Sequence, residues 1–131
     1  MKKVSVIGAG SWGSALAVLL AHNGHEVTLL SHDSKEIEML QKEREQKDKL
    51  PGVKLPENIK VSADLEETLT GRDVIVMAVP SPVVRSMATR MAPYIKEGQV
   101  IVNVAKGIED ETYKTLTEII EEEIPGAVVC V

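Results

Sequence analysis

A glycine-rich segment near the start of the chain is the clearest candidate for chemistry. The segment Gly8–Gly13 (GAGSWG) has the spacing G-x-G-x-x-G and lies between a β-branched run and a segment rich in Ala and Leu. Gly8 would permit a tight turn, Gly10 would let a pyrophosphate approach the backbone, and Gly13 would let a helix pack closely on the preceding strand. The helix N-terminus would offer free N–H groups to the phosphates. In this context the motif predicts a dinucleotide-binding turn rather than an ordinary glycine-rich turn.

A second candidate site lies roughly 20 residues further on, where the adenosine ribose of a bound dinucleotide is expected. NAD-selective proteins usually place an acidic residue there. Here Ser31 and His32 come first and the acid, Asp33, comes third. Ser31 and His32 could bind a 2′-phosphate, which favours NADP, whereas Asp33 could turn inward and favour NAD. His32 could also be a solvated loop residue. We expect NAD or NADP as the cofactor, with a lean toward NADPH.

Two further candidates follow later apolar runs. Pro80 and Pro82 come directly after the most apolar run, where they could form a rigid wall against the cofactor or simply begin a helix. Lys106 is the only cation that the strand order would bring to the edge of the glycine turn. It could meet the nicotinamide, a substrate phosphate or a carbonyl that gains charge during reduction, although such loop lysines are commonly solvated.

Strands and helices alternate in the segments that would position these residues. Apolar runs predict strands over Lys3–Ile7, Glu26–Leu30, Ile59–Ser62, Asp73–Val79, Gln99–Val104 and Ala127–Val131. Helices are predicted over Ser11–Asn23, Ser34–Arg44, Asp64–Leu69, Pro82–Met91 and Glu111–Glu123, with Ser34 and Asp64 as N-caps. The charged stretch Gln41–Leu50 and the prolines after it predict a surface loop. The alternation predicts an α/β fold of the Rossmann type, a doubly wound, mainly parallel sheet with helices on both faces, in one domain over residues 1–131.

Composition narrows the class of protein. The chain has 131 residues, 44% of them hydrophobic, and its net charge of −5 together with only 2% aromatic residues makes a nucleic-acid partner a poor fit. The single cysteine, Cys130, excludes an intrachain disulfide, fits a reducing compartment and is expected to be buried in its strand. One cysteine and three histidines make no zinc-type ligand set. No apolar run approaches the ~20 residues that span a bilayer, so we expect a cytoplasmic protein without membrane insertion.

Four segments follow one another in the order of a known family. They are VIGAGSWGSALAVLLAHNGHEVTL, LPGVKLPENIKVSADLEE, DVIVMAVPSPVVR and VNVAKGIE, and together they cover nearly the whole chain. In this order they resemble the bacterial-type NAD(P)-dependent glycerol-3-phosphate dehydrogenases. The resemblance covers only the N-terminal cofactor domain of that family. It implies that the helical C-terminal domain, with the general acid/base lysine, lies outside this chain, in keeping with a chain that ends within an apolar strand.

The resemblance also implies an activity and residue roles. The family transfers a hydride reversibly between NAD(P)H and dihydroxyacetone phosphate, giving sn-glycerol 3-phosphate for phospholipid synthesis, and its full-length members are expected to be homodimers. Ser11 and Trp12 would lie near the cofactor pyrophosphate, and His32 or Asp33 on the adenosine side, where relatives often carry arginine. Lys106 would serve cofactor and substrate. No catalytic residue would lie in this chain, which alone would be inactive.

Other interpretations stay open on the residues alone. The chain could be a stand-alone nicotinamide-binding redox sensor, although its apolar ending, EEIPGAVVCV, counts against a self-sufficient domain. It could also be the cofactor domain of another dehydrogenase, against which the GSWG and AKG segments count. Trp12 could pack over a cofactor, at a domain interface or within the core.

Overall fold

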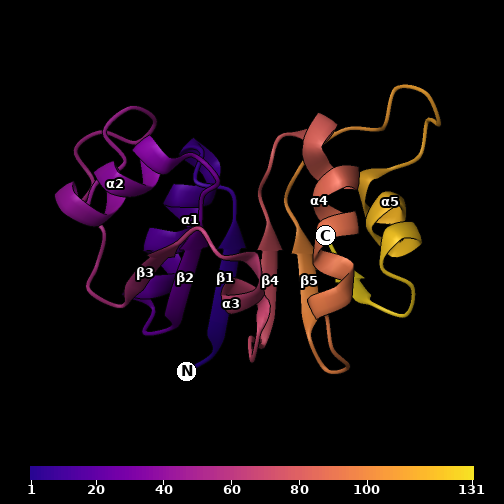
Figure 1. Cartoon of the computed structure of the whole chain (residues 1–131), viewed down its shortest axis with the longest axis horizontal. Coiled ribbons are helices and arrows are strands. Elements are labelled where there is room, and N and C mark those ends of the chain that lie inside the picture. Colours follow the sequence, from indigo (N-terminus) through magenta and orange to yellow (C-terminus); the bar gives the residue numbers. More distant parts are fainter.

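Six parallel strands form the centre of the computed structural model, which describes residues 1–131. They are β1 (Lys3–Ile7), β2 (Glu26–Leu30), β3 (Ile59–Ser62), β4 (Val74–Met77), β5 (Val100–Asn103) and β6 (Val128–Cys130). Their order across the sheet is β3-β2-β1-β4-β5-β6, and every neighbouring pair is parallel (Figure 1). The strand order therefore reverses between β1 and β4. The predicted Rossmann-type sheet is confirmed.

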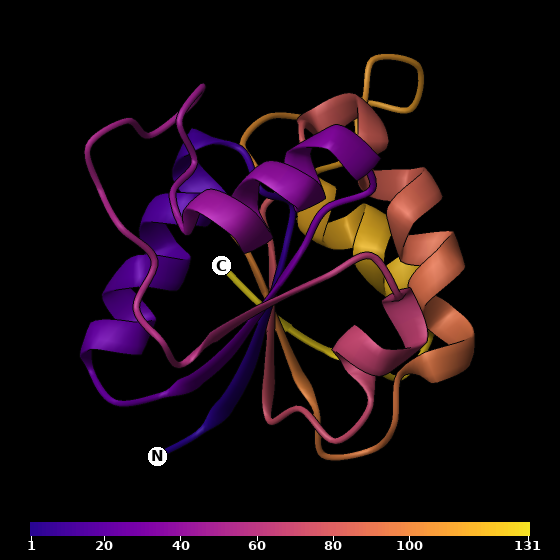
Figure 2. The same ribbon diagram turned by 60° about the vertical axis from the view of Figure 1, so that its left-hand side comes forward.

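Helices cover both faces of this sheet. They are α1 (Ser11–His22), α2 (Ser34–Glu43), α3 (Leu65–Leu69), α4 (Val84–Met91) and α5 (Leu116–Glu123), with 3₁₀ turns at Ser81–Val83 and Ala92–Tyr94. Buried residues of α1 and α2 pack with one face of the strands, and those of α3, α4 and α5 pack with the other. Figure 2 shows the two helical layers on opposite sides of the strands.

The strand β4 shows why a run apolar on both faces sits at the centre of the sheet. It pairs with β1 on one side and with β5 on the other. Ile75 and Met77 pack into one core, whereas Val76, one residue out of step, packs into the other. A strand with helices on both faces buries side chains on both of them, so its sequence is continuously apolar rather than alternating.

One predicted helix start and one predicted N-cap are wrong. The helix α5 begins at Leu116 rather than at Glu111, because Thr115 and Glu118 form a reciprocal capping box there. The residues before it form a small hairpin in which Ile108 pairs with Thr115 and Tyr113 has a φ of 59°. The N-cap of α2 is Asp33 rather than Ser34, since Asp33 Oδ1 accepts the N–H groups of Lys35 at 2.9 Å and of Glu36 at 3.4 Å.

Two expectations about burial are also wrong. Cys130 is exposed, because it lies on β6, an edge strand that pairs only with β5. The segment between α2 and β3 is not entirely a surface loop: Gln46 is fully buried and Leu55 is 6% exposed. The longest helix, α1, has 12 residues, and no helix is long and apolar enough to cross a bilayer.

Candidate functional site

A cleft opens at the carboxyl edge of the sheet, at the point where the strand order reverses. Its volume is about 420 Å³. In open parallel sheets, ligands bind at this switch point because the loops after β1 and β4 diverge there and leave a crevice. The cleft is lined by Gly8–Trp12 after β1, Leu30–His32 at the end of β2, Ala78–Pro80 after β4, and Glu36, Lys49, Val83 and Met87. Three of the four candidate segments of the sequence therefore meet in one place.

The three glycines of the turn have different structural roles. Gly8 has a φ of +111°, and a Cβ there would lie 2.9 Å from the carbonyl oxygen of Ala78. A Cβ on Gly13 would lie 2.1 Å from the carbonyl oxygen of Gly8, so α1 could not pack this closely on the turn with any other residue. A Cβ on Gly10 would meet no atom within 4 Å. The fold needs Gly8 and Gly13, whereas Gly10 leaves open space in the cleft.

The N-terminus of α1 has the features of an anion-binding site. Its N-cap is Gly10, no side chain caps the helix, and no acidic residue lies in the first turn. The first regular helical bond runs from Ser14 N–H to Gly10 O at 2.9 Å. The N–H groups of the preceding residues therefore have no intrahelical partner, and the helix dipole adds a partial positive charge. Together with the open space at Gly10, this arrangement fits the diphosphate of a dinucleotide.

Trp12 and Ser11 lie on the outer side of the same turn. The Trp12 side chain lines the cleft and is 59% exposed, so the alternative that it packs in the core is wrong. Ser11 Oγ donates a hydrogen bond to Lys49 O at 2.7 Å. The glycine turn is thereby tied to a segment 38 residues further along the chain.

The three residues predicted for the adenosine side, Ser31, His32 and Asp33, have different positions and contacts in the structure. Ser31 is 3% exposed, and its Oγ donates to Glu36 Oε1 at 2.6 Å. His32 is exposed and lines the cleft. Asp33 does not line the cleft, because its carboxylate accepts the N–H groups at the start of α2. The residue that the sequence suggested as the acid of this site is used as a helix cap.

Sequence reasoning missed a polar cluster formed by Glu36, Gln46 and Lys49. The Gln46 Nε2 group donates to Ala9 O at 2.7 Å and to Glu36 Oε2 at 3.0 Å. Both partners are acceptors, so the amide must turn its NH₂ group toward them. Lys49 Nζ lies 2.9 Å from Glu36 Oε2. A weak signal was available, since Gln46 is the only uncharged residue between Glu43 and Lys49.

The cluster keeps Glu36 ionised. Partial burial by itself would raise the pKa of this carboxyl group, because the charged form is poorly solvated. Hydrogen bonds from Ser31, Lys49 and Gln46, together with the charge of Lys49, act in the opposite direction and hold the pKa of Glu36 below its usual value. The cleft therefore carries a fixed negative charge near the end of β2.

The two prolines after β4 take one role each. Pro80 lines the cleft beside Val79 and Met87. Pro82 lies in the first turn of the 3₁₀ segment that leads into α4, where its missing N–H costs nothing. The helix start is therefore confirmed for Pro82, and the wall against the cofactor stays a prediction for Pro80, which borders the cleft.

Lys106 lies at the same edge of the sheet but outside the cleft. Its side chain is exposed, and it is not among the lining residues. The turn that carries it is well defined: Asn103 Oδ1 accepts the N–H of Ala105 at 3.0 Å, and Gly107 has a φ of +112°. The sequence placed the lysine at the correct edge, and the structure leaves its head group in solvent.

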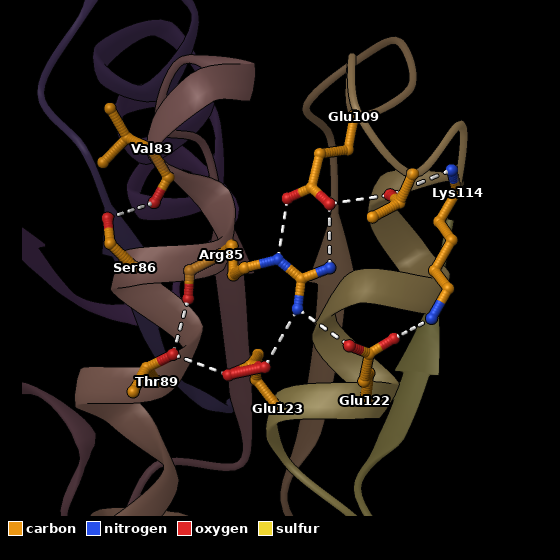
Figure 3. A network of polar contacts seen from close by, with 9 residues as sticks. Val83, Arg85, Ser86, Thr89, Glu109, Lys114, Glu122 and Glu123 are labelled. Atoms are coloured by element: carbon orange, nitrogen blue, oxygen red, sulfur yellow. Dashed lines mark hydrogen bonds and ion pairs between the residues drawn. The ribbon is translucent and has the colours of Figure 1, made fainter.

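An ion-pair network anchors the segment that follows Lys106 (Figure 3). Arg85 on α4 forms two hydrogen bonds with Glu109, at 2.7 Å and 2.9 Å. The same guanidinium contacts Glu122 at 2.9 Å and Glu123 at 3.0 Å on α5, and Lys114 pairs with Glu122. The forked geometry of arginine suits this bidentate contact. Three residues after Lys106, the loop is therefore fastened to α4 and, through the same guanidinium group, to α5.

We expect this anchoring to weaken in acid. The hydrogen bonds from Arg85 lower the pKa of Glu109 from its usual 4.5 to about 2. A lowered folded-state pKa stabilises the fold fully above pH 4.5 and loses this contribution as the pH falls toward about 2. The difference in unfolding free energy between the native chain and Glu109→Gln should therefore be largest at neutral pH and disappear near pH 2, as measured by urea unfolding. Asp110→Asn, an exposed neighbour that does not pair with Arg85, is the control. An equal effect of both substitutions at neutral pH would contradict the prediction.

Comparisons with known proteins agree with this architecture. Residues 3–131 match the family model described as NAD-dependent glycerol-3-phosphate dehydrogenase N-terminus. The chain is 54% identical to a glycerol-3-phosphate dehydrogenase, NAD(P)+, of Agathobacter rectalis, over 100% of this chain and 39% of that protein. It is 52% identical to a protein of the same name from Fusobacterium nucleatum, over 95% of this chain and 37% of that protein.

A solved structure has the same fold as this chain. The crystal structure of glycerol-3-phosphate dehydrogenase from Coxiella burnetii superposes with a TM-score of 0.92 and 33% identity, covering 98% of this chain and 39% of that one. The chain thus spans less than half the length of these relatives.

Proposed function

Because the chain belongs to the family of NAD-dependent glycerol-3-phosphate dehydrogenase N-terminal domains, we propose that it is the dinucleotide-binding part of an NAD(P)-dependent glycerol-3-phosphate dehydrogenase. The observation that carries the proposal is the cleft at the strand-order reversal, where the open space at Gly10 meets the uncapped end of α1. The family match favours this assignment over the cofactor domain of another dehydrogenase class.

Each part of the cleft takes one part of the dinucleotide in this proposal. The N–H groups at the start of α1 donate to the diphosphate, and Trp12 covers it from the solvent side. Ser31 and His32 border the adenosine ribose. Pro80 forms the wall on the side of β4, toward the nicotinamide. When bound, the cofactor supplies the hydride that is exchanged with dihydroxyacetone phosphate to give sn-glycerol 3-phosphate.

Lys106 is the residue of this chain that we assign to the substrate as well as to the cofactor. Its exposed ammonium group stands at the cleft's edge of the sheet, on a loop held by Asn103 and by the contact between Arg85 and Glu109. A cation in this position stabilises a substrate phosphate or the charge that develops on a carbonyl oxygen. The general acid/base and most substrate contacts belong to the rest of the enzyme, a cytoplasmic homodimer that serves phospholipid synthesis.

Titration with dinucleotide tests the proposal directly. Trp12 is the only tryptophan of the chain and lines the cleft. Adding NADH or NADPH should therefore quench its fluorescence in a saturable way, because a bound dinucleotide changes the surroundings of the indole. Isothermal calorimetry on the same protein should give a matching affinity, and adenosine, which lacks the diphosphate, should bind far more weakly. Absence of saturable binding in both measurements would refute the proposed function.

A further inference from the structure

We propose that Glu36 is a specificity-determining residue, which disfavours a dinucleotide with a 2′-phosphate on its adenosine ribose relative to one with a free 2′-hydroxyl group. The inference rests on the proposed function, because it assumes that the cleft binds a dinucleotide. It concerns a residue that no motif of the sequence singled out.

The position of Glu36 is the first argument. In this fold the acid that recognises the adenosine ribose usually stands at the end of β2. Here that position holds Ser31, and the next acid, Asp33, is used to cap α2. The hydrogen bond from Ser31 Oγ to Glu36 Oε1, 2.6 Å long, brings a carboxylate from the first turn of α2 back to the end of β2. Glu36 lines the cleft, whereas Asp33 does not.

The rigidity of the carboxylate is the second argument. Ser31 holds one oxygen, and Gln46 and Lys49 hold the other at 3.0 Å and 2.9 Å. The Glu36 side chain is only 14% exposed, and Gln46 is itself buried and fastened to Ala9 O. A side chain held by three donors cannot swing into solvent to avoid an incoming phosphate without breaking these contacts.

The remaining hydrogen-bonding capacity is the third argument. An ionised carboxylate offers about four acceptor sites and no donor. Three are used here, which leaves one on Oε1, the oxygen that accepts only from Ser31. A ribose hydroxyl can donate to such a site. A 2′-phosphate cannot donate when ionised, and its charge repels the carboxylate in a partly desolvated cleft.

Lys49 offsets this repulsion only in part. Its ammonium group is already paired with Glu36 Oε2, and its side chain is 48% exposed, so solvent screens its charge more than that of Glu36. His32 also lines the cleft and is exposed. The more buried charge facing this end of the cleft is therefore negative.

A pair of charge-matched substitutions tests the role of Glu36. Glu36→Gln removes the charge in the cleft, whereas Glu38→Gln removes the same charge from an exposed position of the same helix. Dissociation constants for NADH and NADPH are measured at matched ionic strength by Trp12 fluorescence and by calorimetry. We expect the ratio of the NADPH constant to the NADH constant to fall by about tenfold in Glu36→Gln and to stay unchanged in Glu38→Gln.

The outcomes separate this inference from the proposed function. Binding of both dinucleotides with an unchanged ratio in Glu36→Gln overturns the role of Glu36 and leaves the proposed function intact. An equal fall in both variants also overturns it, because the effect would then be one of net charge. Failure of the native chain to bind either dinucleotide overturns both. If Glu36→Gln has an altered circular dichroism spectrum, Glu36→Ala provides the same comparison and is expected to shift the ratio in the same direction.

Discussion

Replacement of Gly10 by valine is expected to abolish dinucleotide binding while leaving the fold intact. The backbone of Gly10 has a φ of −71° and a ψ of −173°, an extended conformation that valine adopts readily. A Cβ at this position meets no protein atom within 4 Å, so the substitution causes no clash within the chain. The added side chain instead fills the space in which the diphosphate approaches the backbone. We expect affinity to fall by at least roughly 100-fold in a calorimetric titration with NADH.

Two controls make this result specific. Circular dichroism and the midpoint of urea unfolding should match those of the native chain, which separates loss of binding from loss of fold. Gly10→Ala, which adds a single methyl group, should reduce the affinity less than valine does. Affinity retained by Gly10→Val would show that the phosphates bind elsewhere.

The second large effect is expected at Gly13, where alanine should destabilise the fold. A glycine inside a helix normally gains about 1 kcal/mol of stability when it becomes alanine. Here the new Cβ would lie 2.1 Å from Gly8 O and 3.3 Å from Ala78 Cβ. The closest of these atoms belongs to the backbone of the turn, and Gly8 is already restricted to a φ of +111°. The helix must therefore move away from the sheet, at a cost of about 3 kcal/mol.

Urea unfolding of Gly13→Ala against Gly10→Ala measures this cost. The two substitutions add the same methyl group three residues apart in the same motif. Gly10→Ala should leave the unfolding free energy nearly unchanged, because its methyl group meets no protein atom. A Gly13→Ala variant as stable as the native chain would mean that α1 can shift without loss, and that close packing is not the reason for the third glycine.

The contrast between these two glycines illustrates the limits of sequence reasoning. The spacing G-x-G-x-x-G predicts a turn with three glycines, and the roles suggested for Gly8 and Gly13 agree with the structure, whereas the phosphate role of Gly10 stays a prediction. Only the coordinates show that Gly13 faces backbone at 2.1 Å while Gly10 faces open space. The 2.1 Å distance is to Gly8 O, within the turn itself. The second close contact of a Cβ on Gly13, 3.3 Å from Ala78 Cβ, depends on where the chain after β4 places Ala78, 65 positions beyond Gly13, and no local pattern contains that information.

The adenosine side of the cleft was harder to predict for the same reason. Asp33 and Ser34 are both good N-cap residues, and the choice between them follows from the local backbone, in which Asp33 is extended. With Asp33 used as a cap, the acid that lines this end of the cleft is Glu36, from the first turn of α2. The contacts that bring Glu36 there include one from Gln46, whose other partner, Ala9, is 37 residues away in sequence. The expectation of NADPH rests on Ser31 and His32 alone and takes no account of the Glu36 carboxylate.

The sequence by itself determined the alternation of strands and helices, the parallel sheet and the position of the glycine turn. These follow from short-range causes, since β-branched runs favour strands, helix caps act within one turn, and glycine relieves strain locally. Tertiary structure alone decided that Gln46 is buried, that Glu36 and Lys49 face the cleft, that Cys130 is exposed, and that Arg85 fastens the loop beyond Lys106. Each of these features depends on where the strand order places residues that are far apart in the sequence. Contacts between such residues produce no periodic pattern in the sequence.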